Sequence, residues 1–326
     1  MTTPTLGKEP AFLRPAGFSA FAGERISDGQ RLRSLTAVFI RNLGHGLGRK
    51  LLLALSLLPA LGMASYALAR GWFGDQAAAG GSNSGFFAAI AVAPEQQTAF
   101  LVDNLHLLFS AEVGWLLLLQ VGLVAPLIAR DIRQGALILY FSRPVRRSHY
   151  LLARVAAAAG TVALALILAG WLTVLAHLVG FGWQLPGTIF GDSGWLLWPT
   201  LMLAVALAAI FIALVSTLLA LACGALMANP SAAGLVLGGG ILGSVGISWV
   251  LQLVWGRNTL ARAVDLHHAL FAPIRLLTIG FDAADAPDFA VLDAATGVGL
   301  WLALGVIGWL ILARFIANPP LGRGRT

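Results

Sequence analysis

The chain has 326 residues, of which 58% are hydrophobic and only 11% are charged, and its mean hydropathy is +0.84. Soluble globular domains carry about 25% charged residues, so this composition excludes that class and indicates an integral membrane protein. The formal charge of +7 is explained by basic residues on the cytoplasmic side of a membrane protein, and no nucleic-acid partner is expected. The single cysteine, Cys223, gives neither a disulfide framework nor the spacing of metal ligands.

Residues 1–50 are expected to form a cytoplasmic N-terminal segment. Residues 1–30 lack the apolar core of a signal peptide, so no cleavage is expected. Residues 31–43 predict an amphipathic helix that lies in the membrane interface as an elbow before the first span. An ordinary basic juxtamembrane segment is the alternative. The apolar stripe of this predicted helix consists of Leu32, Leu35, Phe39 and Leu43.

Six segments are long and apolar enough to cross a bilayer, because a spanning helix needs about 20 mostly apolar residues. Asn229 and Pro230 predict a sharp break between the fourth and the fifth. The expected fold class is therefore all-α, with one six-helix transmembrane domain at 51–317 and a cytoplasmic tail at 318–326. The predicted spans are about 51–69, 104–129, 150–179, 195–226, 231–255 and 292–317.

The distribution of charge orients these spans. With the N-terminus in the cytoplasm, 17 of the 21 Lys and Arg residues lie in the inside segments 1–50, 130–154 and 314–326. This partition follows the positive-inside rule. We therefore expect a multi-pass protein of the cell (inner) membrane with both termini in the cytoplasm. The outer loop between the last two spans contains Leu266–Ile274, which is apolar enough to lie on the outer interface or dip into it.

A basic hairpin at 130–149, between the second and third spans, is the most informative segment. A short apolar run in it is interrupted by a proline, and the residue before a proline is driven out of the α region. Two ordered pieces around a proline are more than topology requires, so the pattern favours a surface that grips a soluble partner. A loop whose arginines only set the topology is the alternative. The residues of the predicted coupling surface are Arg130, Asp131, Arg133, Gly135, Arg143, Pro144, Arg146 and Arg147.

The run from Ile128 to Leu152 resembles the signature of ABC-2 type transporter permeases. In that family an acidic residue and a glycine, here Asp131 and Gly135, precede a short apolar helix and an Arg-Pro step, here Arg143-Pro144. More loosely, the resemblance covers nearly the whole chain: an elbow helix, six spans and an outer loop between the last two. The chain departs from the family in its Arg133-Gln134 pair, where many relatives carry a further acidic residue, and in a longish outer loop at 71–103.

The resemblance implies the architecture of a type V exporter and a division of labour. A separate cytoplasmic ABC ATPase dimer would bind ATP and Mg and move the permease through the hairpin. The permease would work in membrane lipid beside a second copy of itself or a similar permease subunit. The chain has no Gly-x-x-x-x-Gly-Lys-Ser/Thr phosphate loop, so no enzymatic activity, catalytic residue or cofactor of its own is expected. The transported substrate is not indicated.

Polar residues inside the spans are candidates for a substrate path. Glu112 is the leading one: it suits a cationic group of a substrate, a proton, or an Arg or backbone partner. If the second span starts late, however, Glu112 lies merely near the membrane surface. Gln120, His177 and Gln252 have weaker claims, because each is typical of a hydrogen bond between helices.

Two other function classes stay open. One is a non-transporting membrane scaffold that recruits a cytoplasmic partner. The other, less favoured, is an intramembrane lipid-modifying enzyme, which would need clustered carboxylates or a Ser/His pair at matching depth. Asp265 with His267 and His268 invites a metal site, but adjacent histidines on a helix project in different directions, so no metal is expected.

Overall fold

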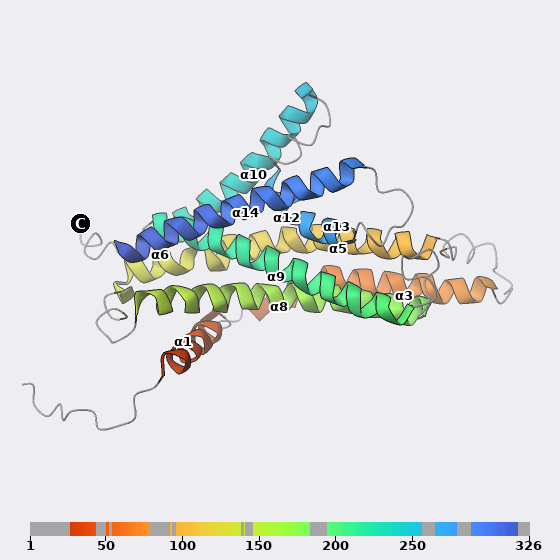
Figure 1. Ribbon diagram of the computed structural model, residues 1–326, viewed down its shortest axis with the longest axis horizontal. Coiled ribbons are helices and arrows are strands. Elements are labelled where there is room, and N and C mark those ends of the chain that lie inside the picture. Colours follow the sequence, from red (N-terminus) through yellow and green to blue (C-terminus); the bar gives the residue numbers. More distant parts are fainter. Residues whose placement is uncertain are drawn as a thin grey trace, which may run out of the picture.

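The computed structural model describes residues 27–43, 50–51, 54–78, 92, 96–137, 140, 146–182, 194–227, 229–255, 265–278 and 288–318. Within these ranges the regular elements are helices, and no strand occurs. Among these described residues, five helices are long and apolar enough to cross a membrane (Figure 1). The chain is therefore an all-α, multi-pass membrane protein, as its composition predicts.

The five long helices lie close to predicted spans. The first of them runs from Gln97 to Arg133, over 37 residues, and contains a π-helical turn. Helix α10 starts at its proline because a proline suits the first helical position, where its missing N–H is not needed. The elements are α5 (Gln97–Leu119), the π-helix η3 (Gln120–Val124), α6 (Pro126–Arg133), α8 (Arg147–Phe181), α9 (Gly194–Leu226), α10 (Pro230–Trp255) and α14 (Asp288–Ala317).

The helix expected at 51–69 is interrupted and extends further along the chain. Residues 50–51 and 54–55 are helical, residues 56–57 form a turn, and helix α3 (Leu58–Ala78) begins one residue before Pro59. Proline is tolerated in the first turn of a helix but not in its interior. The shifted helix packs along α8, yet it contains Arg70 and Asp75 and is not one of the five long apolar helices. The predicted sixth span thus stays a prediction.

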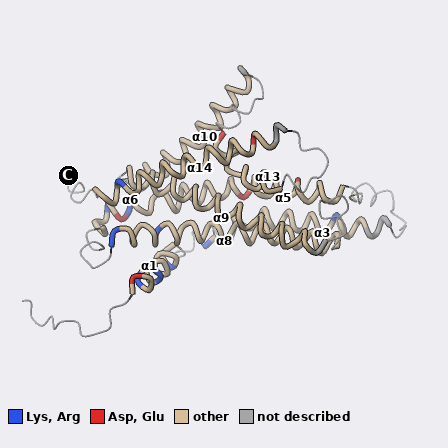
Figure 2. Tube along the Cα trace, viewed as in Figure 1, with Lys and Arg blue, Asp and Glu red and all other residues tan. Residues whose placement is uncertain are grey.

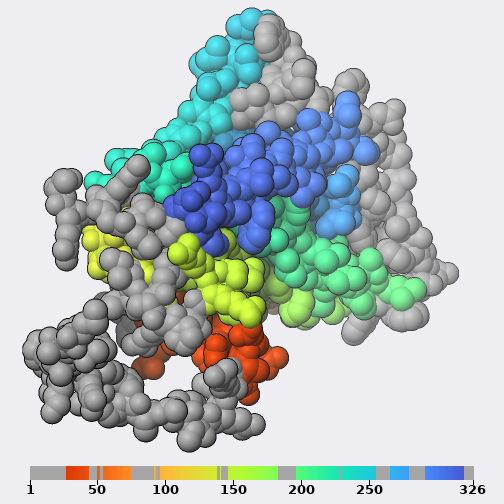
Figure 3. Space-filling model, turned by 60° about the vertical axis from the view of Figure 1, so that its left-hand side comes forward, coloured from red at the N-terminus to blue at the C-terminus, as the bar shows by residue number. Residues whose placement is uncertain are grey.

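Helix α9 occupies the middle of the bundle. It packs against α8, α14 and α10, and 61% of its most apolar stretch is buried, compared with 22% for α10 and for α14. Helix α10 leans away from the other helices (Figures 1 and 3). Its large exposed side chains include Leu235, Leu242 and Trp249. Such an apolar face suits contact with lipid rather than water.

Helix α1 (Asp28–Leu43) forms where the apolar stripe predicts the elbow helix. The stripe faces the protein: Phe39 and Leu43 are buried, Leu32 and Leu35 are partly buried, and α1 packs on α8. Figure 3 shows α1, in red, beside the start of α8 at one end of the bundle. The elbow is therefore attached to the bundle through the same residues that were expected to lie in the membrane interface.

Two short helices between α10 and α14, α12 (Leu266–Leu270) and α13 (Ala272–Thr278), pack against α5, α9 and α14. His106 Nε2 lies 2.7 Å from the hydroxyl oxygen of Thr278. His267 Nε2 lies 3.2 Å from the carbonyl oxygen of Ser110. These two contacts fasten the apolar segment to α5, so it dips into the bundle.

The closest helix approach next to η3 needs a glycine. A Cβ atom on Gly224 of α9 would lie 2.2 Å from the carbonyl oxygen of Ala125. We expect Gly224→Ala to lower the free energy of unfolding by about 1–3 kcal/mol, because the backbones must separate. Gly160→Ala is the matched control, since a Cβ at exposed Gly160 meets nothing within 4 Å. Thermal unfolding in detergent measures both, and equal midpoints for the two variants would contradict the close approach.

Candidate functional site

Basic residues gather at one end of the bundle, where α6 and α14 end and α8 begins, with α1 nearby (Figure 2). The basic hairpin lies at this end. Gly135 follows α6 with a φ of +67°, a left-handed conformation that glycine adopts without steric cost, and its N–H donates to the carbonyl oxygen of Ile132 at 3.1 Å. Gly135 thus ends the helix and turns the chain.

A buried ion pair stands at the base of the hairpin. Asp131 of α6 is 7% exposed and Arg154 of α8 is 6% exposed. Arg154 Nη2 donates to Asp131 Oδ2, and the Tyr150 hydroxyl donates to the same oxygen at 2.5 Å. Buried charges are tolerated when they are paired and hydrogen-bonded. The pair therefore ties together the two helices that flank the hairpin.

Aromatic rings extend this pair to the elbow helix. The guanidinium carbon of Arg154 lies 3.8 Å from the centroid of the Phe39 ring, which is cation–π distance. Phe39 packs edge-on against Tyr140 and Tyr150, at centroid distances of 6.1 and 5.9 Å. Burial and then the charge of Asp131 raise the pKa of the Tyr140 phenol above its ordinary value, so it stays neutral. We name these five residues, Phe39, Asp131, Tyr140, Tyr150 and Arg154, the anchor cluster.

The predicted coupling residues have different environments. Asp131 and Gly135 hold the shape of the hairpin base, Arg130 is partly buried, and Arg133 is exposed. Arg143 and Pro144 lie outside the described residues. The sequence predicts all of these as one surface, whereas the described residues divide into an internal part and an external part.

The last two arginines of the hairpin are exposed and contact neighbouring helices. Arg146 Nη2 lies 3.5 Å from Asp28 Oδ2 at the start of α1. Arg147 Nη1 donates to the carbonyl oxygen of Ile316 in α14 at 3.3 Å. Exposed ion pairs contribute little stability, about 0–1 kcal/mol, so these side chains remain able to exchange partners.

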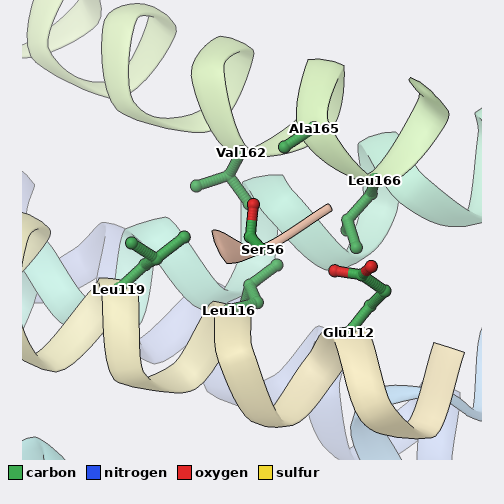
Figure 4. Close-up of a pocket in the computed structure, with 7 residues that line it drawn as sticks. All are labelled: Ser56, Glu112, Leu116, Leu119, Val162, Ala165 and Leu166. Atoms are coloured by element: carbon green, nitrogen blue, oxygen red, sulfur yellow. The ribbon is translucent and has the colours of Figure 1, made fainter. Parts of the chain in front are cut away.

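A second candidate region surrounds Glu112. Figure 4 shows its carboxylate in a small pocket between α5 and α8, near Ser56. Glu112 is 3% exposed, and its Oε1 has no hydrogen-bond partner among the described residues. The backbone N–H of Ala60, in the first turn of α3, bonds to the carboxyl group. N–H groups of a first turn lack partners within their own helix, so Glu112 helps to cap α3.

The helix around Glu112 also begins earlier than expected. Because α5 starts at Gln97 rather than near 104, Glu112 lies well inside the long helix. Its burial places the carboxylate within the protein rather than on its surface. In this environment the carboxylate of Glu112 is suited to binding a proton or a cationic group.

Gln120 serves the packing of the π-helix. Its Nε2 donates to the hydroxyls of Ser216 and Thr217 in α9, at 3.0 and 3.2 Å. Pro126 has no N–H, and just before it the Ala125 N–H donates to the carbonyl oxygen of Gln120 at 2.8 Å, which closes a π-helical turn. The Gln120 side chain thus forms hydrogen bonds between helices, at a turn where the helix is distorted.

His177 and Gln252 have similar local roles. The amide of Asn104 lies 3.0 Å from His177 Nε2, and the Nδ1 of the same ring lies 2.8 Å from the carbonyl oxygen of Thr173. Gln252 Nε2 donates to the Ser248 hydroxyl of its own helix at 2.9 Å. His177 therefore links α8 to α5, whereas the partner of Gln252 lies within α10.

The adjacent histidines of α12 have separate partners. Asp265 caps α12 by accepting the His268 N–H at 3.0 Å. His268 Nε2 lies 3.3 Å from Asp293 Oδ2 and 2.9 Å from Arg275 Nη1, which also donates to Asp293 at 3.0 Å. This cluster joins α12, α13 and α14. Within the described ranges no group of three or more His, Cys, Asp or Glu residues is placed to hold a metal.

Sequence reasoning missed Arg154 as a site residue. Two features of the sequence could have revealed it. Arg154 is a lone charge in an apolar helix, and such a charge needs a partner. Tyr150 lies one turn earlier on the same face of that helix. The partners Asp131 and Phe39 come from other segments, and their spacing in the sequence does not reveal them.

Breaking the buried pair tests the anchor cluster. Asp131→Asn leaves the Arg154 charge buried without a carboxylate, so we expect a loss of about 3–5 kcal/mol in thermal unfolding. The double variant Asp131→Leu with Arg154→Met removes both charges and should recover most of that loss. Arg133→Gln, on the exposed side of α6, should stay within about 0.5 kcal/mol of the parent protein. A double variant no more stable than the single one would contradict the pairing.

Amide hydrogen exchange at the start of α3 tests the capping by Glu112. Glu112→Gln keeps an acceptor for the Ala60 N–H, whereas Glu112→Leu removes it. Loss of a cap costs about 1 kcal/mol, so exchange at the start of α3 should be about fivefold faster in the Leu variant than in the Gln variant. Equal exchange in the two variants would show that the carboxyl group does not hold α3.

No protein-family model matches the chain, and no curated protein matches it. The residues of the hairpin and the anchor cluster are therefore the basis on which a function is proposed.

Proposed function

We propose that this chain is the membrane-spanning permease subunit of an ATP-driven ABC transporter of the ABC-2 type, working as an exporter. A separate cytoplasmic ATPase dimer, which carries ATP and Mg, moves it through the hairpin. The anchor cluster is the observation that carries the proposal. It joins α6, Tyr140 of the hairpin, α8 and α1 through one buried ion pair, so a force on the hairpin reaches all of them together.

The charge distribution supports a cytoplasmic hairpin. Basic residues at the end where α6 and α14 finish satisfy the positive-inside rule if that end and both termini lie in the cytoplasm of the inner membrane (Figure 2). In this orientation α12 and α13 lie at the opposite side. Helix α3 serves as the first of six spans, and α1 is the interfacial elbow.

The exposed arginines supply the contact with the ATPase. Arg133 is exposed, and it has no ion pair among the described residues. Within the part of the chain that the structure describes, the ion pair of Arg146 is the exposed one with Asp28. A carboxylate of the partner can replace Asp28 at little cost, because exposed pairs contribute about 0–1 kcal/mol. A second copy of this chain, or a similar subunit, completes the permease.

A non-transporting scaffold is the second candidate function. Gln120, His177 and Gln252 are occupied by helix packing, which leaves Glu112 as the polar group facing a pocket among the four predicted path residues. A scaffold needs only the exposed hairpin. It would bind the partner without coupling to ATP hydrolysis.

Co-purification in mild detergent, with an ATP hydrolysis assay, tests the proposal. Arg133→Glu, and Arg143→Glu combined with Pro144→Ala, should lower the retained ATPase subunit about tenfold or more, because like-charge contacts cost several kcal/mol. Arg314→Glu is the matched control: it makes the same charge change at the exposed end of α14, outside the hairpin. A retained partner without ATP hydrolysis would favour the scaffold. Absence of any nucleotide-binding subunit from the intact protein would contradict both ATPase coupling and export.

A further inference from the structure

We propose that a pocket between η3, α6 and the start of α10 binds an anionic phospholipid, with Arg130 holding the phosphate group. This inference goes beyond the transporter proposal and rests on it only for the cytoplasmic orientation of the basic end of the bundle. The pocket is open and has a volume of about 290 Å3, close to the lower end of the range of roughly 300–1,000 Å3 that small-molecule sites occupy. The lining residues that the argument uses are Val121, Gly122, Arg130, Ser231, Gly234 and Leu235.

The charge of Arg130 points to an anionic ligand. The neighbouring carboxylate, Asp131, is buried and committed to Arg154 and Tyr150. Among the described residues no carboxylate lies within ion-pair distance of Arg130. A partly buried guanidinium presents a planar set of donors that matches the oxygens of a phosphate group.

The opposite wall of the pocket is apolar. Val121 precedes Arg130 by nine residues, roughly 13 Å along a helix axis, so the pocket extends from the basic end of the bundle toward its middle. Leu235 of α10 borders it and is 75% exposed. A free phosphate ion would use only the Arg130 end. A phospholipid uses both the Arg130 end and the apolar lining. Basic pockets between spanning helices on the cytoplasmic side are known to bind anionic head groups.

Two glycines with different surroundings line the pocket. A Cβ atom on Gly234 would lie 2.8 Å from the carbonyl oxygen of Val121, so α10 approaches η3 closely there. Gly122 is exposed, and a Cβ on it would meet nothing within 4 Å. A larger side chain at position 122 therefore enters the open space of the pocket without disturbing the helices. This gives a way to block the site while every charge is kept.

Native mass spectrometry of the full-length protein in detergent, titrated with phosphatidylglycerol, tests the site. We expect Arg130→Gln to weaken phosphatidylglycerol binding about fivefold, the factor that corresponds to the roughly 1 kcal/mol contributed by one basic residue. Gly122→Leu should weaken it at least as much. Arg314→Gln at the exposed end of α14, away from the pocket lining, and Gly160→Leu on exposed α8 surface are the matched controls and should bind like the parent protein. Unchanged thermal unfolding of Gly122→Leu verifies that this variant is folded.

Separate titrations with inorganic phosphate and phosphatidylcholine identify the ligand. Binding of phosphatidylglycerol in preference to both supports the proposal. Inorganic phosphate that binds through Arg130 while phosphatidylglycerol does not would overturn it in favour of a free anion. The proposal would also be overturned if Arg130→Gln and Gly122→Leu bound lipid like the parent protein. It would be overturned as well if Arg130→Gln lost a co-purified protein while its lipid binding stayed unchanged.

Discussion

A charge inside an apolar helix needs a partner, and the bond from Arg154 to Asp131 supplies it where four segments of the chain meet. Arg154 lies two turns into α8, and Asp131 lies in the last turns of α6. Their pairing fixes both ends of the hairpin. Because Phe39 covers the guanidinium, the elbow helix is held to the same point. The position of the hairpin thus depends on one buried contact rather than on its own loop.

This contact divides the long helix Gln97–Arg133 into two parts with different restraints. On the hairpin side, α6 is bound to α8 by the ion pair. On the other side, Gln120 is bound to α9 through two hydroxyl groups. The π-helix and Pro126 lie between these restraints, where the regular hydrogen-bond ladder is already broken. Motion of the anchored end is therefore absorbed most easily at η3, since π-helical turns are places where a helix bends.

Local features of the sequence predicted much of the fold. Long apolar runs and the break at Pro230 located the five long helices of the described residues, and the stripe ending at Leu43 located α1. Helix α3 shows the limit of hydropathy alone: the apolar run begins at 51, but a turn at 56–57, just before Pro59, interrupts the helix. The anchor cluster was beyond prediction for another reason. Its members are brought together by helix packing, and no spacing in one sequence encodes which of many arginines meets Asp131.

The end of α6 shows how one basic stretch acquires several roles. Successive residues of an α-helix point about 100° apart, since there are 3.6 residues per turn. Asp131 faces the core and Arg154. Arg130 and Arg133 are three residues apart, only about 60° around the helix, so they lie on one side of it. Arg130 is partly buried and lines the pocket beside α10, whereas Arg133 is exposed. In the sequence these residues form a single charged motif. In the fold the motif has one side that contacts the protein interior and a basic side, along which we propose the lipid site and the contact with a partner. A hairpin fixed by the internal contact would present that basic side to a partner in a defined orientation, which is the condition for transmitting force through a short loop.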